Sequence, residues 1–342
     1  MASAAFHIPS SERTVLVSII DTTSQVSIET DKVFVPRRPG HDYLTVPNYS
    51  FLIKHPVLGR TVLFDLGLRK DWWNSAPVVR NILQEGQSHL SVRKDIREIL
   101  QDGGVPITTI DTIVWSHWHI DHIGDPSLFD TNVKLIVGPG FKEHILPPYP
   151  PNKDSMVLQS DFEGRELEEL SFTENSLKIG RFNAIDYFGD GSFYFLDAPG
   201  HSIGHIAALA RVKSAPDSFI LMAGMGVSMV ALLLSPDLSP YDSALKAVCA
   251  KGDMRTPFYS AARNGVSYNV DDANTTVSYL QDADGRDDIF IVFSHDEALL
   301  DIVDFFPSTA NEFMQKGWVD KSKWVFLRDF IKSETDAASV AR

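Results

Sequence analysis

The chain has 342 residues, which suits one large domain or two of ordinary size, because single hydrophobic cores seldom grow beyond about 250–300 residues. Hydrophobic residues make up 44% of the chain and charged residues 22%, and this balance excludes a disordered or fibrous protein. The 31 basic and 45 acidic residues give a net charge of −14. Such a surface disfavours nucleic acid, anionic membranes and polyanionic substrates as partners.

The chain has one cysteine, Cys249, so neither an internal disulfide nor a site with several thiolate ligands is expected. The first residues lack the basic and apolar regions of a secretory signal, and no apolar run approaches the roughly 20 residues of a membrane span. These features predict a protein of the reducing cytoplasm. Any bound metal would have to rely on histidines and carboxylates.

Strands and helices are predicted to alternate along the chain. Runs of β-branched and apolar residues indicate strands, whereas spaced apolar residues that end at glycine indicate helices. In chain order we expect a strand at 14–21, a hairpin over 48–67, helices over 75–84 and 91–102, strands at 110–117, 133–138, 183–188, 192–198, 205–212 and 218–224, helices over 240–250 and 273–282, a strand at 289–296 and a C-terminal helix over 323–333.

These elements are expected to form a single domain over residues 14–335, with flexible ends at 1–13 and 336–342. The first dozen residues are small and polar, as is common for a frayed terminus. A segment that contains four prolines between residues 147 and 151 is too rich in proline for regular structure, and we interpret it as a candidate lid.

Four candidate metal ligands occur within six residues, directly after a predicted buried strand: His117, His119, Asp121 and His122. Residues two apart in an extended segment point to the same side, so His117 and His119 can bind one ion. A turn would then direct Asp121 and His122 to a neighbouring point. The spacing therefore predicts two adjacent metals, for which zinc is suited, although manganese, iron and cobalt accept the same ligand types.

The isolated histidines of the chain need no metal. A single histidine after a strand is usually a surface or capping residue, and we interpret five of them in this way: His7, His41, His55, His89 and His144. Three imidazoles and a carboxylate packed together, in contrast, would desolvate one another at a cost unless a cation organised them. The segment 117–122 is therefore the predicted functional site.

Several motifs together resemble the metallo-β-lactamase-fold hydrolases and, more closely, their lactonase and lactamase branch of fungal type. The resemblance covers about residues 14–310 and rests on FDLG at 64–67, SHWHIDHIGD at 116–125, PGHSIGH at 199–205, ILMAG at 220–224 and VFSHD at 292–296. It implies an α/β fold, a four-layer αββα sandwich, with a two-metal site at one edge of two facing sheets.

The resemblance also implies a set of ligands. His117, His119 and His201 would hold the first metal, Asp121, His122 and His295 the second, and Asp65 would lie behind them and accept an imidazole N–H. The residues themselves agree for His201, because Pro199 and Gly200 favour a sharp turn that presents it. His205 is expected to be structural.

The chain departs from the family after the ILMAG strand. There the family has an aspartate that bridges both metals, and this chain has Met225. A thioether is neutral and soft, so the second metal should lose affinity, while the first site keeps three histidines and an open position. Two interpretations stay open: a hydrolase with one tightly bound metal, or a catalytically degenerate relative that binds a ligand.

We expect metal-assisted opening of a small cyclic ester or amide, because a zinc-bound water has its pKa lowered from about 15.7 towards 7 and yields hydroxide at neutral pH. Asp121 would orient or deprotonate this water. A thioester hydrolase of the same fold is an alternative, but no cationic contacts for glutathione are evident. Metal count, substrate identity and oligomeric state are left open. Five aromatic residues are expected to line a pocket for a flat, hydrophobic substrate: Trp72, Trp73, Trp118, Phe141 and Tyr149.

Overall fold

The computed structural model describes residues 6–37, 42–85, 90–173, 175–224, 259–263, 265–323 and 325. Several expectations fall outside these residues: the helix at 240–250, most of the helix at 323–333, the tail at 336–342, and the positions of Met225, Cys249, His41 and His89. Within the described residues, no helix is long and apolar enough to cross a membrane.

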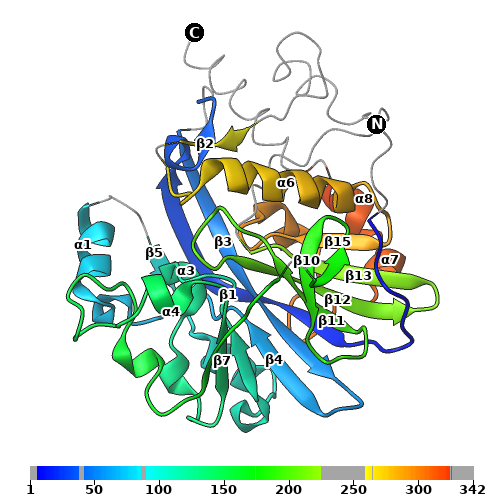
Figure 1. The fold of residues 1–342 in the computed structure, drawn as a ribbon, viewed down its shortest axis with the longest axis horizontal. Helices are drawn as coiled ribbons and strands as arrows, with labels where there is room; N and C mark the ends of the chain where they lie inside the picture. The colour runs from blue at the N-terminus through cyan, green and yellow to red at the C-terminus, as the bar shows by residue number, and fades with distance from the viewer. Residues whose placement is uncertain are drawn as a thin grey trace.

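Two β-sheets form the centre of the molecule (Figure 1). The first sheet has the strand order β5-β1-β3-β4-β6-β7-β8, the second has the order β15-β13-β12-β11-β10-β9, and β14 and β2 form a separate ribbon. The first sheet consists of β1 Leu16–Glu29, β3 Tyr43–His55, β4 Arg60–Phe64, β5 Leu90–Val92, β6 Thr112–Val114, β7 Lys134–Val137 and β8 Leu167–Glu169. The second consists of β9 Leu177–Ile179, β10 Phe182–Asp186, β11 Phe193–Asp197, β12 Ile206–Ser214, β13 Asp217–Met222 and β15 Ile289–Val292, and the ribbon of β2 Phe34–Val35 and β14 Ser260–Ala261.

Side-chain alternation along the strands creates the layers. In the first sheet, Ile19 and Phe51 join the core between the two sheets, whereas their neighbours Ile20 and Leu52 join an outer cluster with helix α2 (Ile96–Asp102). The second sheet behaves in the same way, because Leu196 and its same-face neighbours pack outward with helix α6 (Val270–Asp284). Helix, sheet, sheet and helix follow one another, so the expected αββα sandwich is confirmed.

Helices α2 and α6, which cover the two sheets, begin at residues whose side chains cap them. Asp95 caps α2 through a reciprocal pair of hydrogen bonds with Glu98, and the side chain of Asn269 accepts the backbone N–H groups of the first turn of α6. Figure 1 shows α6 lying along β15. The other helices are α1 Pro77–Glu85, α3 Ile120–Ile123, α4 Phe141–His144, α7 Phe313–Lys316 and α8 Trp318–Ser322.

The structure corrects three sequence-based expectations. Residues 91 and 92 are not helical but belong to β5, which pairs with β1, so the expected helix starts at Ile96. His55 is not at the surface, since it is 1% exposed and its Nε2 lies 2.8 Å from Asp190. It does cap the turn after β3, because its Nδ1 accepts the Leu58 N–H at 3.2 Å. Phe6 is buried in the outer cluster of the second sheet, so packed structure begins before residue 14, and the extent of the domain stays a prediction.

The proline-rich segment at 147–151 has no helix or strand, as expected, apart from an isolated bridge between Tyr149 and Leu158. Its neighbour Met156 lines the cavity described below. Whether the segment acts as a lid stays a prediction.

Strand direction brings the functional motifs to one edge of the sandwich. β4 and β6 are parallel in the first sheet, and β11, β13 and β15 share one direction in the second. Two backbone hydrogen bonds join the sheets at this edge, from Ile206 N–H to the Ser116 carbonyl (2.8 Å) and from Tyr49 N–H to the Ser294 carbonyl (2.9 Å). The candidate ligands follow the carboxyl ends of these strands.

Candidate metal centre

The five histidines and one aspartate implied as ligands lie in two adjoining clusters. The first cluster comprises His117, His119 and His201, and the second comprises Asp121, His122 and His295. Within each cluster the ligand atoms all lie within 4.8 Å of one another. The ring centroids of His117 and His122 are 4.1 Å apart, so the two clusters are in contact.

The segment 117–122 supplies residues to both clusters because it changes conformation in the middle. The chain is non-helical between the end of β6 and His119, which is the N-cap residue of α3 and has an extended backbone conformation. The backbone N–H of His122 donates to the His119 carbonyl at 2.9 Å and starts the helical turn. The non-helical part therefore supplies His117 and His119 to the first cluster, and the helical part supplies Asp121 and His122 to the second.

A tight turn between β11 and β12 presents His201. Gly200 has a φ of 119°, and a Cβ at this position would lie 2.0 Å from the backbone nitrogen of Ala273 in α6. Only glycine allows the helix to approach this closely. The hydroxyl of Thr276 on α6 donates to the Pro199 carbonyl at 2.7 Å, so the helix fixes the turn that holds His201.

Asp65 lies fully buried behind both clusters. Its Oδ1 accepts the backbone N–H of Ser116, and its Oδ2 accepts the Ser116 hydroxyl and the His122 Nδ1–H, each at 2.7 Å. The Ser116 oxygen in turn accepts the His117 Nδ1–H at 3.0 Å. Asp65 has a φ of 61°, a conformation that few non-glycine residues adopt and that is found preferentially at functional sites. The carboxylate of Asp65 thus orients an imidazole of each cluster, directly for His122 and through Ser116 for His117.

Two further imidazoles are held by backbone carbonyls. His295 Nδ1–H donates to the Pro47 carbonyl at 2.9 Å, and His205 Nδ1–H donates to the Ala198 carbonyl at 2.7 Å. Because a carbonyl only accepts, the lone pair of each neutral ring is on Nε2. His205 is thus anchored to the backbone, as a structural role would require.

The electrostatics of the two clusters differ. Burial, reinforced by the neighbouring imidazoles, holds the pKa of His117 and of His201 well below the usual range, and burial lowers the pKa of His119 to about 4. In the second cluster burial opposes both charged forms, but the partners outweigh it. His122 and His295 lower the pKa of Asp121, and Asp121 and Asp65 raise the pKa of His122. Burial thus favours the neutral form of the first cluster, whereas charge pairing favours the ionised form of Asp121 and the protonated form of His122 in the second.

The donor set fits a divalent cation. Among the described residues, four Nε2 atoms are buried without a hydrogen-bond partner, those of His117, His122, His205 and His295. A buried polar atom without a partner costs about 1–3 kcal/mol. The strongest case is His117, because Ser116 already holds its Nδ1–H. A cation among neutral imidazoles and a carboxylate would satisfy these nitrogens with ligands that zinc accepts.

A mainly aliphatic cavity of about 370 Å³ opens beside both clusters. The expected aromatic lining is wrong, because none of Trp72, Trp73, Trp118, Phe141 and Tyr149 lines it. Phe141 packs instead against Trp115 in the core, with ring centroids 6.0 Å apart, and Trp73 is 56% exposed. Four ligand candidates lie at one end of the cavity: His119, Asp121, His201 and His295.

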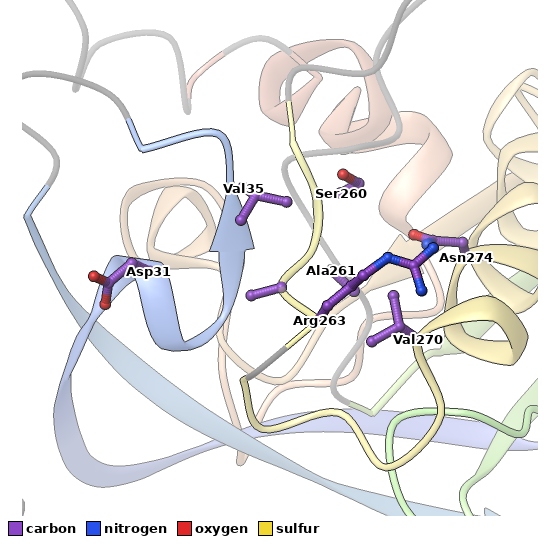
Figure 2. Close-up of a pocket in the computed structure, with 8 residues that line it drawn as sticks. Asp31, Val35, Ser260, Ala261, Arg263, Val270 and Asn274 are labelled. Atoms are coloured by element: carbon purple, nitrogen blue, oxygen red, sulfur yellow. The ribbon is translucent and has the colours of Figure 1, made fainter.

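A second pocket lies at the surface between the β2–β14 ribbon and the start of α6 (Figure 2). Its lining includes Asp31, Val35, Arg263 and Asn274. The Arg263 guanidinium is 3.3 Å from the carboxylate of Asp271, at an exposed position. None of the clustered histidines lines this pocket, so it is separate from the metal centre.

Sequence reasoning missed two residues that support the clusters. Ser116 links Asp65 to His117, and its place directly before His117 is the only local signal for this role. Asn48 on β3 donates from Nδ2 to the backbone carbonyl of Asp121 at 2.8 Å. These two residues are 73 positions apart, so no local pattern reveals the contact.

Comparison with known proteins gives consistent likenesses. The sequence profile described as Metallo-beta-lactamase superfamily matches residues 44–208. Gamma-lactamase FDB1 of Fusarium pseudograminearum (strain CS3096) is 38% identical to this chain, over 98% of the chain and 86% of that protein. Metallo-hydrolase mfmC of Annulohypoxylon moriforme is 36% identical, over 96% of the chain and 90% of that protein.

Among solved structures, a mutant of AiiA from B. thuringiensis with N-decanoyl-L-homoserine bound at the active site aligns with a TM-score of 0.58. The alignment covers 88% of this chain and 100% of that chain, at 17% sequence identity. At this identity the likeness concerns the fold alone.

Proposed function

The chain belongs to the metallo-beta-lactamase superfamily and is a metallo-hydrolase, and from this premise we propose that it opens the ring of a small cyclic ester or amide, a lactone or a γ-lactam. The observation that carries the proposal is the pair of adjoining ligand clusters at the end of an apolar cavity. The 38% identical relative named as a gamma-lactamase supports the cyclic amide, and a cyclic ester presents the same kind of carbonyl.

The proposal assigns the first cluster, His117, His119 and His201, to one metal ion and the second cluster, Asp121, His122 and His295, to another. Zinc is the preferred ion, because neutral imidazoles and one carboxylate suit it, and manganese, iron and cobalt are the alternatives. When bound, such an ion polarises the scissile carbonyl and lowers the pKa of a coordinated water towards 7.

Asp121 is the catalytic residue of this proposal, with the role of orienting the attacking water and accepting its proton. Its carboxylate lines the cavity, and its Oδ2 lies 3.3 Å from His295 Nε2 and 3.7 Å from His122 Nε2. Asn48 holds the Asp121 backbone, which limits how far the carboxylate can move. Asp65 has the role of orienting His122 directly and His117 through Ser116.

The proposal gives the two clusters unequal affinity. Met225 stands where the family resemblance places a bridging aspartate, and a thioether does not replace a carboxylate between two hard cations. We therefore expect one tightly bound ion in the first cluster and a weaker second ion. The single cysteine and the net charge of −14 support a cytoplasmic reaction on a small molecule, without nucleic acid or membrane as partner.

The test combines elemental analysis of the purified chain with ring-opening assays on simple lactones and γ-lactams at one fixed pH. We expect about one zinc per wild-type chain and measurable turnover, and His117→Ala should remove both. Met225→Asp should raise the metal content towards two. A wild-type chain that is inert and metal-free, but that gains both properties in Met225→Asp, would instead identify a degenerate relative that only binds ligands.

A further inference from the structure

The cavity beside the clusters has two chemically different ends. At one end lie the proposed ligands, and the rest of the lining is mainly aliphatic. Among the described residues that line the cavity, the only titratable side chains are Asp121 and four histidines, and no lysine or arginine is present. The described part of the lining therefore offers no lysine or arginine to a substrate at the aliphatic end.

The aliphatic end is built on the distal halves of β1 and β3. Residues two apart on a strand share a face, and the register places four aliphatic side chains on one face as two cross-strand pairs, Val26 with Val46 and Ile28 with Leu44. The intervening Ser27 and Thr45 point to the opposite, exposed side, where their hydroxyls lie 2.5 Å apart. We call the four paired side chains the aliphatic wall.

Helix α6 forms another part of the cavity lining. Ala273, Val277 and Leu280 are spaced so that they share one face of the helix, and all three line the cavity. They are buried, whereas the aliphatic wall is only partly buried. Partly exposed aliphatic side chains that face a cavity are stabilised by an apolar group that excludes water from them.

We propose that this cavity selects uncharged substrates that carry an extended apolar substituent, with the cyclic ester or amide at the ligand clusters and the substituent along the aliphatic wall. This inference rests on the proposed function and names its substrate class. An anionic substituent would lose its hydration without meeting a cationic side chain of the described lining. A cavity of about 370 Å³ is within the range of small-molecule sites, so it has room for a ring and a substituent.

The test uses one lactone ring with unbranched substituents from ethyl to decyl, each with a counterpart that ends in a carboxylate. We expect kcat/KM to rise up to about fourfold per added methylene until the cavity is filled. The terminal carboxylate should lower kcat/KM at least about 100-fold. Equal kcat/KM along the series, or equal kcat/KM with and without the carboxylate, would overturn the inference. Turnover of the ethyl lactone would still support the proposed function in that case.

Cyclic ethers with the same substituents keep the inference testable without hydrolysis, because calorimetry measures their Kd directly. If no lactone is opened at any length, the proposed function fails. The ethers then test the substrate class alone, and their Kd should decrease with chain length. A Kd that does not depend on length would overturn the inference on its own.

A matched pair of variants locates the effect on the wall. Val26→Lys places a cation in the aliphatic wall and should lower kcat/KM for the decyl lactone at least about tenfold, while reducing the penalty on its carboxylate counterpart. Gln25→Lys adds the same charge to the neighbouring, exposed residue on the other face of β1 and should change neither value. Equal behaviour of the two variants would place the substituent elsewhere and overturn the inference.

Discussion

The two ligand clusters differ in charge, although they adjoin and share the segment 117–122. The first cluster consists of two buried imidazoles and one partly buried imidazole and contains no acid. The second contains Asp121, whose carboxylate lies 3.3 Å from His295, and its His122 is hydrogen-bonded to Asp65 at 2.7 Å. The second cluster thus pairs part of its charge internally. The first has no carboxylate: His119 Nδ1 and His201 Nε2 lie 3.0 Å apart, and His117 Nε2 has no partner among the described residues.

This difference indicates that the two clusters contribute unequally to metal binding and to catalysis. Three neutral ligands leave the charge of a bound ion available to polarise a substrate carbonyl, and His₃ sites with an open position are typical of catalytic zinc. In the second cluster a cation would first have to displace the proton that Asp121 and Asp65 favour on His122, because an imidazole binds metal in its neutral form. We therefore expect the first cluster to bind more tightly and to contribute more to turnover.

The largest expected effect comes from removing the histidine that each cluster takes from a distant strand end. His201→Ala should empty the first cluster and lower kcat/KM about 10³-fold or more, because several kcal/mol of carbonyl polarisation are lost. His295→Ala should lower kcat/KM only about 10–100-fold and leave one ion bound. Elemental analysis and steady-state kinetics measure both quantities.

His7→Ala is the matched control, since His7 is exposed and far from both clusters in the sequence, and it should behave as wild type. If His295→Ala lowered kcat/KM more than His201→Ala did, the second cluster would contribute more to turnover than the first, contrary to the proposal.

An intermediate effect is expected from the residues behind the clusters. Asp65→Asn removes the carboxylate that His122 and Ser116 share, so metal affinity should fall about 10–100-fold, most at the second cluster. Ser116→Ala removes the acceptor of His117 and one hydrogen bond to Asp65 but keeps the Asp65 carboxylate, so it should weaken the first cluster by less than about tenfold. Competition with a chelator measures both affinities.

Asp186→Asn, at the last residue of β10, serves as the control for a partly buried carboxylate outside the centre. If Asp65→Asn weakened both clusters equally, Asp65 would act through overall rigidity and not through the two hydrogen bonds.

The sequence predicts the parts of this centre that depend on local spacing. The motif at 117–122 identifies candidate ligands from six consecutive residues, and strands that end in histidine follow from apolar runs. His201 and His295 are separated from this motif by long stretches, and only the family resemblance connects them to it. The αββα fold likewise followed from the order of motifs, and the structure confirms it.

Contacts between distant segments are what the sequence could not supply. The apolar spacing of residues 91–102 favours a helix throughout, but Ser91 pairs with Gln25 and joins a sheet edge instead. Aromatic character predicts that Phe141 is buried but not which cavity it lines, and it packs on Trp115. The hydrogen bond from Asn48 to Asp121 has no local pattern at all.

The smallest expected effect concerns the support of the second cluster. Behind α3, Asp161 is 1% exposed; its Oδ2 accepts the Leu158 N–H at 2.8 Å and its Oδ1 has no partner among the described residues. Arg69, which pairs with Asp125 at 2.9 Å, and Arg165 are the cations near it. Burial raises the pKa of Asp161 to about 7, and Asp125 adds to this, although the Leu158 hydrogen bond and both arginines oppose it.

An aspartate in the unfolded chain has a pKa of about 3.9, so the folded state holds this proton more tightly. The stabilisation is fully present below about pH 4 and is lost as the pH rises through about 7. The amide of Asp161→Asn does not ionise, so the variant does not lose stability in this way. Its free energy of unfolding relative to wild type should therefore be about 1–4 kcal/mol higher at pH 8 than at pH 5. Urea unfolding at both pH values measures the gain, and the exposed Asp130→Asn is the control. If the difference in free energy of unfolding between Asp161→Asn and wild type were the same at both pH values, Asp161 would be ionised throughout. The residues that support the second cluster would then be no more sensitive to pH than the apolar core behind the first.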